Sequence, residues 1–297
     1  MDVKVVFLAH RVEFLKLLEE EIKGYHTLVL EEPDDENLKN FLNGYISLEE
    51  YVKLSNTGFP LYAVHQALLM KKLHSKGVEI IQIEPYLTIM EKIYQSIETG
   101  KFEEYILDPN VKRVLEIEKE VVRALIEYQE EFMKGEFNGL VNKVIEFSKK
   151  DARRFKLRDL MRAEAVAASR LDDRVVVEAG YMHILLPVYL EEKGVRVSTI
   201  NLVEKACKIL NSRYLENPGD ILTKAYITER ELGDEERLKA AQSIIYQLLI
   251  SRDEKEPTSE VLFPHLIEEL KIIDEVDEMS YEECRREFYR LLKKTWI

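Results

Sequence analysis

Histidine and glutamate side chains follow four short runs of Val, Ile and Leu that predict β-strands. The four endings are Ala9-His10, Glu31-Glu32-Pro33, Glu84-Pro85 and Glu178-Ala179-Gly180-Tyr181-Met182-His183. In an open parallel sheet, ligands bind outside the carboxyl ends of the strands. We therefore expect two histidines and several glutamates to lie together at one edge of a sheet.

Two histidines with one to three carboxylates suit two kinds of chemistry. A divalent metal takes neutral imidazole and ionised oxygen ligands, and His10, Glu32 and His183 are the candidate metal ligands. Without a metal, a histidine beside carboxylates acts as a general base and activates water. On either view His10, Glu31, Arg158 and His183 are the candidate catalytic residues, and their spacing leaves both alternatives open.

Four further residues are candidates for supporting roles. Glu84 and Glu178 are second-choice ligands or orienting groups. Glu13 completes an H-x-x-E pattern whose two side chains would share a helix face. Gly180 lets the backbone turn tightly after its strand and approach a ligand closely. The histidine that follows it is then expected in the first turn of the next helix.

The strongly basic run in this acidic chain is Arg153-Arg154-Phe155-Lys156-Leu157-Arg158-Asp159. One interpretation is a solvated helix face. The other is that Arg158 projects into the strand-end cleft and, with Arg154 and Tyr181, binds the substrate. A guanidinium is a permanently charged, forked donor suited to a carboxylate or an oxyanion. Asp159 would orient that arginine or a histidine.

Several catalytic motifs are absent from the sequence. There is no H-E-x-x-H, which argues against a thermolysin-like zinc site, and no G-x-G-x-x-G or Walker A pattern. There is no G-x-S-x-G, which argues against a serine-nucleophile hydrolase. The two cysteines, Cys207 and Cys284, form no CxxC pair, so neither a disulfide framework nor a zinc ribbon is indicated.

Alternation of strand-like and helix-like segments predicts an α/β fold with a mainly parallel central sheet of five or slightly more strands and flanking helices. Helical periodicity predicts helices over 12–23 and 60–75, and Ser47-Leu48-Glu49-Glu50 reads as a capping box. The predicted strands are 3–8, 27–30, 78–83, 174–178 and 195–200.

Two long stretches carry no strand signal. Residues 85–171 predict a helical cap of three or four helices inserted between strands three and four, with corners at Gly135, Gly139 and Asp108-Pro109-Asn110. Residues 201–297 predict a helical C-terminal extension packed on the core. The expected domains are therefore an α/β core over 1–200, with its cap, and a tail over 201–297.

Composition limits the classes of partner. The 297 residues carry 43 Lys and Arg against 56 Asp and Glu, a formal net charge of −13. A non-specific nucleic-acid binder needs a basic surface, so nucleic acid is not an expected partner. No apolar run reaches the ~20 residues of a membrane span, and no signal-peptide layout is visible. We expect a soluble cytoplasmic protein, and the heavy use of Lys and Glu with little Gln fits a thermophile.

The order of these motifs resembles the superfamily that joins the TraB/PrgY and Tiki proteins with the erythromycin-esterase and ChaN-like proteins. Phe7-Leu8-Ala9-His10 stands at its first Gly-x-x-His-like motif, with Phe7 in place of glycine. Leu28-Val29-Leu30-Glu31-Glu32 stands at the strand ending in Glu, and Arg158-Asp159-Leu160-Met161 at the Arg-Asp segment. Gly180-Tyr181-Met182-His183 matches the second Gly-x-x-His motif.

This resemblance covers about residues 3–200 and implies a hydrolase that cleaves a peptide or ester bond by His/Glu-based activation of water, with or without a divalent metal. The family's activities are diverse, and its ChaN-like members imply an alternative: a non-catalytic protein that binds haem or another macrocycle in the same cleft. A member that retains the fold without activity is a third alternative. The expected partner is a small-molecule or peptide substrate, and a homo-oligomer is an open alternative to a monomer.

Overall fold

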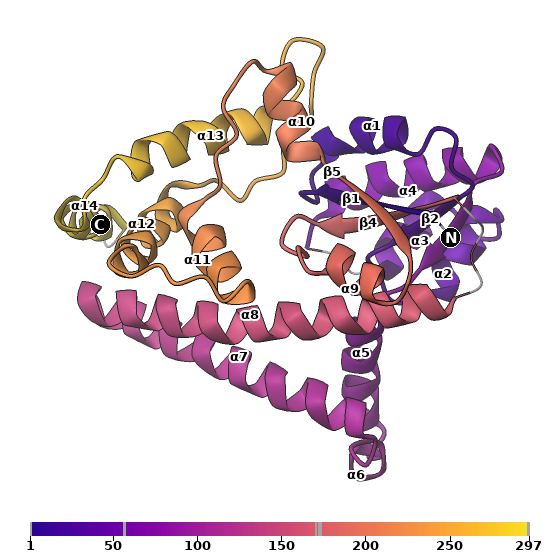
Figure 1. The fold of residues 1–297 in the computed structure, drawn as a ribbon, viewed down its shortest axis with the longest axis horizontal. Helices are drawn as coiled ribbons and strands as arrows, with labels where there is room; N and C mark the ends of the chain where they lie inside the picture. Colours follow the sequence, from indigo (N-terminus) through magenta and orange to yellow (C-terminus); the bar gives the residue numbers. More distant parts are fainter. Residues whose placement is uncertain (1, 56–57, 170, 172–173, 296–297) are drawn as a thin grey trace. The chain divides into compact units, whose positions relative to one another are not determined.

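The computed structural model describes residues 2–55, 58–169, 171 and 174–295 (Figure 1). Its centre is a five-stranded, all-parallel sheet with the order β3-β2-β4-β1-β5, which confirms the predicted fold class. The strands are β1 (Asp2–Leu8), β2 (Thr27–Leu30), β3 (Glu79–Gln82), β4 (Arg174–Gly180) and β5 (Arg196–Asn201). Each predicted strand is present within two residues of its expected bounds.

The middle strand, β4, is buried on both faces. It pairs with β1 on one side and β2 on the other, and Val175, Val176 and Val177 are fully buried. Continuous β-branched residues are typical of such a strand, because both faces pack on helices. The register sets Val6 of β1 opposite Glu178. Glu178 therefore lies two residues before Gly180, the last residue of β4.

Helices flank this sheet, and those that begin at Val12, Leu48 and Pro60 start where the sequence patterns predict. The flanking helices are α1 (Val12–Glu21), α2 (Glu36–Leu42), α3 (Leu48–Ser55), α4 (Pro60–Ser75), α9 (Leu186–Glu192) and α10 (Leu202–Ile209). The predicted capping box before α3 is confirmed: Ser47 N–H donates to Glu50 Oε2 over 2.8 Å, and Glu50 N–H donates to Ser47 Oγ over 3.2 Å.

The chain divides into two compact units that differ from the expected domains. The first unit is 1–88, 158–214 and 252–267, and the second is 89–157, 215–251 and 268–297. The expected tail therefore does not form one extension, because residues 252–267 belong with the sheet while the other late helices share a core with the inserted ones. Hydrophobic periodicity predicts that a helix is amphipathic. It carries no information about which helix or sheet the apolar face packs against.

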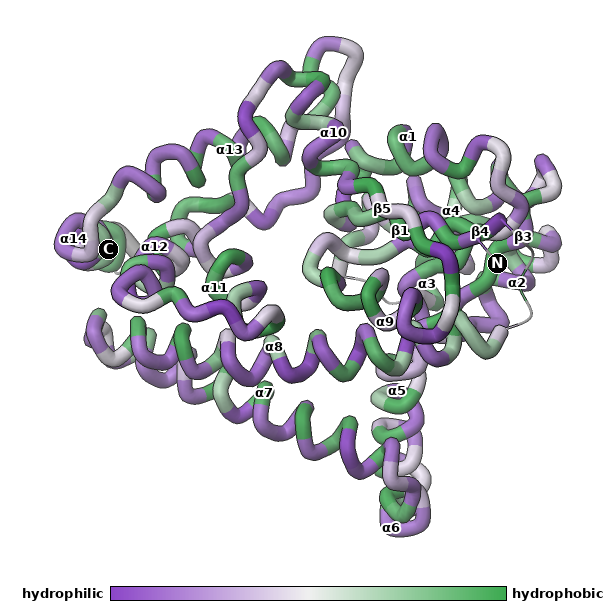
Figure 2. Tube along the Cα trace, in the orientation of Figure 1, coloured by the Kyte–Doolittle hydropathy of each residue, from purple (hydrophilic) through white to green (hydrophobic). Residues whose placement is uncertain are grey.

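The second unit is helical. The helices that lie in it wholly or in part are α5 (Pro85–Glu98), α6 (Phe102–Tyr105), α7 (Pro109–Lys134), α8 (Phe137–Ala168), α11 (Pro218–Ile227), α12 (Glu235–Leu249), α13 (Pro264–Asp277) and α14 (Tyr281–Thr295). Leu140, Val141, Leu222, Ile245 and Phe288 are fully buried in one cluster there. The green residues of Figure 2 mark such apolar positions.

The corners of the inserted helices follow two of the three predicted signals. Asp108 caps α7 by accepting a hydrogen bond from Asn110 N–H at 2.7 Å, and Gly135 ends that helix with a φ of 72°. The prediction of a corner at Gly139 is wrong, because Gly139 lies in the first turn of α8. Its lack of a side chain matters for packing: a Cβ there would lie 2.1 Å from Glu131 Oε1.

In the described part of the chain, none of the helices combines the length and the apolar character that crossing a membrane requires.

Candidate functional site

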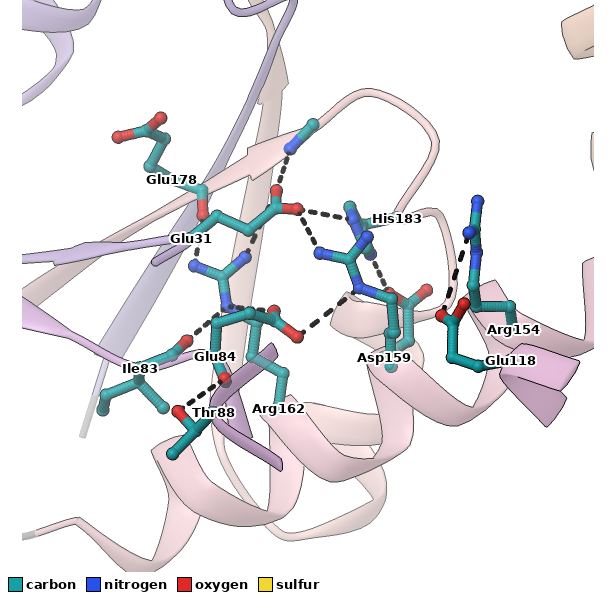
Figure 3. A network of polar contacts seen from close by, with 12 residues as sticks. Glu31, Ile83, Glu84, Thr88, Glu118, Arg154, Asp159, Arg162, Glu178 and His183 are labelled. Carbon is teal, nitrogen blue, oxygen red and sulfur yellow. Dashed lines mark hydrogen bonds and ion pairs between the residues drawn. The ribbon is translucent and has the colours of Figure 1, made fainter. Parts of the chain in front are cut away.

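Glu31, at the end of β2, is the hub of a buried polar network in the first unit (Figure 3). Its Oε1 accepts a hydrogen bond from Arg158 Nη2 at 2.8 Å and lies 2.8 Å from His183 Nε2. Its Oε2 accepts from the backbone N–H of Gly180 at 2.6 Å. Burial opposes ionisation, but His183, Arg158 and Arg162 outweigh it, so the pKa of Glu31 is lowered well below the usual value. Glu31 is therefore a fixed anion.

Two arginines one helical turn apart on α8 meet this carboxylate. Arg158 also faces Glu84 at 3.4 Å, and its side chain is 14% exposed. Arg162 is fully buried and donates to the backbone oxygens of Ile83 at 3.0 Å and Glu178 at 2.6 Å. Through these bonds Arg162 ties the ends of β3 and β4 together.

The sequence patterns above do not single out Arg162. The signal that could have found it is its i, i+4 spacing from Arg158, which puts both guanidinium groups on one face of α8.

His183 lies in the turn between β4 and α9 rather than in the first turn of a helix, and it is 2% exposed. Its Nδ1 is hydrogen-bonded to Asp159, and its Nε2 to Glu31. When both carboxylates are ionised they can only accept, so both ring nitrogens then donate and the ring is an imidazolium. Burial alone would lower the pKa of His183, but the two carboxylates raise it to about 9. Asp159 also accepts from Leu185 N–H at 3.0 Å, which fixes the turn.

His10, two residues after the end of β1, is the accessible histidine of this region. Its side chain is 40% exposed, and its Nε2 lies 3.3 Å from Oε1 of Glu178, which is 1% exposed. The ring of Tyr62 packs edge-on against it at 5.7 Å. Burial would lower the pKa of His10, but the hydrogen bond to Glu178 and the charges of Glu31, Glu178 and Glu32 raise it.

The Glu32 carboxylate is held by two neutral amides. Its Oε1 accepts from Gln66 Nε2 at 2.8 Å and its Oε2 from Gln82 Nε2 at 2.9 Å. The Gln82 Oε1 accepts from Asp35 N–H at 2.9 Å, which settles the orientation of that amide. Burial and the charge of Glu178 raise the pKa of Glu32, in contrast to its neighbour in sequence.

Gly180 marks the point where the predicted residues converge. A Cβ at this position would lie 3.5 Å from Glu31 Oε2, 3.5 Å from His183 Cδ2 and 3.6 Å from His10 Cε1. The structure thus brings together the strand-end residues predicted from the sequence: His10, Glu31, Glu32, Glu84, Glu178 and His183, with Arg158 and Asp159 from α8. Tyr181, the residue after Gly180, is half-buried. Its backbone N–H donates to the backbone oxygen of Leu8.

The contacts predict the effect of Gly180→Ala. All three distances are ordinary van der Waals contacts, and Gly180 is not among the glycines with positive φ. We expect the variant to fold with a free energy of unfolding within about 1 kcal/mol of the wild type, measured by urea denaturation. A loss above about 2 kcal/mol would contradict this geometry.

Two predicted residues lie elsewhere. Glu13 is buried on α1, where it accepts hydrogen bonds from His265 N–H at 2.9 Å and Leu266 N–H at 3.0 Å. It caps the N-terminus of α13 and does not share a site with His10. Arg154 lies in the second unit, 2.5 Å from Asp151 and 3.8 Å from Glu118.

The basic run does not present free cations. Besides Arg154, Arg153 pairs with Glu120, and Lys156 lies 2.8 Å from Glu229. Carboxylates thus pair with these three cations, and the binding of an anionic substrate group by Arg154 stays a prediction. The reason for the pairing is the acidic composition, which supplies carboxylates on neighbouring helices.

The candidate metal ligands His10, Glu32 and His183 are each hydrogen-bonded to other side chains of the chain. Both ring nitrogens of His183 are hydrogen-bonded to carboxylates, Nδ1 to Asp159 and Nε2 to Glu31. Glu32 is committed to two amides. Throughout the described ranges, no group of three or more His, Cys, Asp or Glu side chains is arranged to hold an ion. The cations that compensate the carboxylates are the chain's own arginines.

The fold and this centre define an α/β protein with a buried His-Arg-carboxylate network at the carboxyl edge of its sheet. The chain belongs to the same family as a protein of the thermophilic archaeon Archaeoglobus fulgidus, described as "Uncharacterized protein", with 39% identity over 289 residues. The match covers 97% of this chain and 98% of that relative, so the similar sequence spans both units of this chain. No family model matches the chain. No solved structure matches it either.

Proposed function

We propose that the chain is a hydrolase of an ester or peptide bond in which His10 activates the attacking water. The observation that carries this proposal is the pair formed by the exposed His10 and the buried Glu178, 3.3 Å apart. A carboxylate that accepts from one ring nitrogen fixes the tautomer and leaves the other nitrogen as a base. Among the described residues, Nδ1 of His10 has no hydrogen-bond partner.

The reaction proceeds by direct addition of water. Nδ1 of His10 takes a proton as the water oxygen bonds to the carbonyl carbon, and Glu178 stabilises the imidazolium that forms. Arg158, whose guanidinium is partly exposed beside Glu31, supports the negative charge that develops on the carbonyl oxygen. Collapse of the tetrahedral intermediate breaks the bond to the leaving group, which receives the proton from His10.

This proposal changes the role of His183 and Glu31. The hydrogen bonds of Glu31 and His183 to their buried partners occupy both side chains, so we assign neither a contact with the substrate. We assign them as positioning residues that hold Arg158 and the turn after β4. The resemblance to the TraB/PrgY–Tiki and erythromycin-esterase/ChaN-like superfamily supports hydrolysis as the reaction class and a histidine after the first strand as a participant. The substrate proposed is a small molecule or peptide, in the cytoplasm.

The test is a panel of carboxylic esters and short peptides, with and without added divalent metals, on the wild type and on His10→Gln. We expect hydrolysis by the wild type and a loss of at least about 100-fold in kcat in the variant, the lower end of what general-base catalysis contributes. The pKa of His10 is raised, so wild-type activity should fall as pH decreases through a value above 6.5.

The matched control is His74→Gln, since His74 is an exposed histidine on α4. It should leave activity unchanged. An equally active His10→Gln protein would contradict the role of His10. Absence of hydrolysis together with a Soret band in the purified protein would favour the haem-binding alternative instead.

A further inference from the structure

One face of α7 carries large apolar side chains in contact with solvent. Val122, Ile126 and Met133 are 47%, 48% and 65% exposed, and Leu115 is half-buried in line with them. Figure 2 shows green residues recurring along α7. The opposite face is fixed inside the second unit, where Val114 and Val121 are buried. Val122 and Ile126 lie one helical turn apart and form an exposed apolar pair at the middle of this face. An exposed apolar patch rimmed by polar residues marks an interaction surface.

The outer stripe of α7, defined as residues 115, 119, 122, 126, 130 and 133, has a regular helical spacing. Steps of four, three, four, four and three residues keep all six positions on one face. Two positions of the stripe are charged: Lys119 is basic and Glu130 is acidic, and both are exposed. Neither forms an ion pair or hydrogen bond within the described part of the chain.

The outer stripe of α7 is complementary to the same stripe on an antiparallel second copy. Rotation by two-fold symmetry about the middle of α7, near Ala124, sets Leu115 opposite Met133 and Val122 opposite Ile126. The same rotation sets Lys119 opposite Glu130, because they lie five and six residues from that middle on opposite sides. Apolar residues thus meet apolar ones, and the two interrupting charges meet charges of opposite sign.

We propose that the outer stripe of α7 binds the same stripe of a second copy of this chain, as an antiparallel helix pair in a two-fold symmetric homodimer. Two-fold dimers are the commonest protein oligomers, and their interfaces are self-complementary by construction. A parallel arrangement would set Lys119 beside Lys119 and Glu130 beside Glu130, which like-charge repulsion disfavours. From Leu115 to Met133 the contact runs about 27 Å along the helix.

The first experiment measures the mass of the full chain in solution by sedimentation equilibrium. We expect the wild type to sediment at twice the 34.9 kDa chain mass. The double variant Val122→Glu with Ile126→Glu should sediment as a monomer with an unchanged circular dichroism spectrum, because both side chains are exposed. Leu68→Glu is the matched control, since Leu68 is a 49% exposed leucine on α4, and it should remain dimeric.

The second experiment tests the antiparallel pairing by charge reversal. Lys119→Glu alone and Glu130→Lys alone each place like charges together and should weaken the dimer about tenfold or more in Kd. An equimolar mixture of the two single variants should restore dimers, because each chain then supplies the charge that the other needs. The variant carrying both changes should also dimerise. A matched reversal at an exposed lysine of α3, Lys53→Glu, should have no effect.

Three results would overturn the proposal. One is a wild type that stays monomeric up to about 100 μM, the weak end of specific association. Another is a dimer that survives the two glutamate substitutions in the outer stripe. The third is a mixture of the two charge-reversal variants that remains as weak as either alone. None of these results bears on the hydrolase proposal, which rests on residues of the first unit.

Discussion

The variant His183→Ala is expected to lose about 3–5 kcal/mol of its free energy of unfolding, the cost of breaking a buried ion pair by removing one partner. The imidazolium of His183 lies between Asp159 and Glu31, which are buried or nearly so. Without the imidazolium, Asp159 and Glu31 each lose a hydrogen-bond donor and a compensating positive charge. Because both carboxylates are buried, water does not readily replace that donor. Urea denaturation followed by circular dichroism measures the loss.

The control for this prediction is His74→Ala on the exposed side of α4, where a change within about 0.5 kcal/mol is expected. A loss below about 1 kcal/mol for His183→Ala would show that the network relaxes around the gap. The prediction also affects how activity data are interpreted. An inactive His183→Ala protein reports on folding as much as on catalysis, whereas His10→Gln changes an exposed side chain.

The stability of the protein should fall as pH rises from about 6.5 to 9. The pKa of His183 is about 9 in the folded protein and 6.5 as the ordinary value, so the folded state binds this proton more tightly. Its contribution is complete below pH 6.5 and is lost as the pH passes through about 9. The difference amounts to about 3 kcal/mol, at about 1.4 kcal/mol for each pKa unit.

Glu31 determines how stability depends on pH at the acidic end of the range. Its pKa is lowered in the folded protein, so its contribution is present above 4.5 and is lost as pH falls below that value. Urea midpoints measured between pH 4.5 and 9 therefore should be highest in the acidic half of the range. The control is His183→Gln, in which the decline from pH 6.5 to 9 should be smaller than in the wild type. Parallel profiles for the two proteins would contradict the assignment.

The strands and the strand-end residues could be predicted because both depend on local patterns. Uninterrupted Val and Ile runs such as that of β4 specify buried parallel strands, and parallel strands deliver their next residues to one edge. The partners of these residues could not be predicted. Glu31 and Glu32 are adjacent and chemically identical, yet one faces two arginines and the other two amides. Which of them faces which partner depends on the pleat and on side chains far away in sequence.

The assembly of helices was the least predictable part of the fold. Glu13 was expected beside His10, because an H-x-x-E pattern defines a helix face but not what covers it. In the folded chain Glu13 caps a helix that begins at Pro264, and no local signal connects the two segments. The division of the late helices between two units has the same cause.

The first unit is discontinuous along the chain, and this has a consequence for biosynthesis. Its last segment, residues 252–267, supplies Glu254, which accepts hydrogen bonds from the N–H groups of Leu61 and Tyr62 at the start of α4. During translation, α1 and α4 therefore lack these hydrogen bonds until residues 252–267 have been synthesised. Such long-range closure slows folding. A nascent chain that ends near residue 200 has all five strands but leaves Glu13 and the first turn of α4 without their partners.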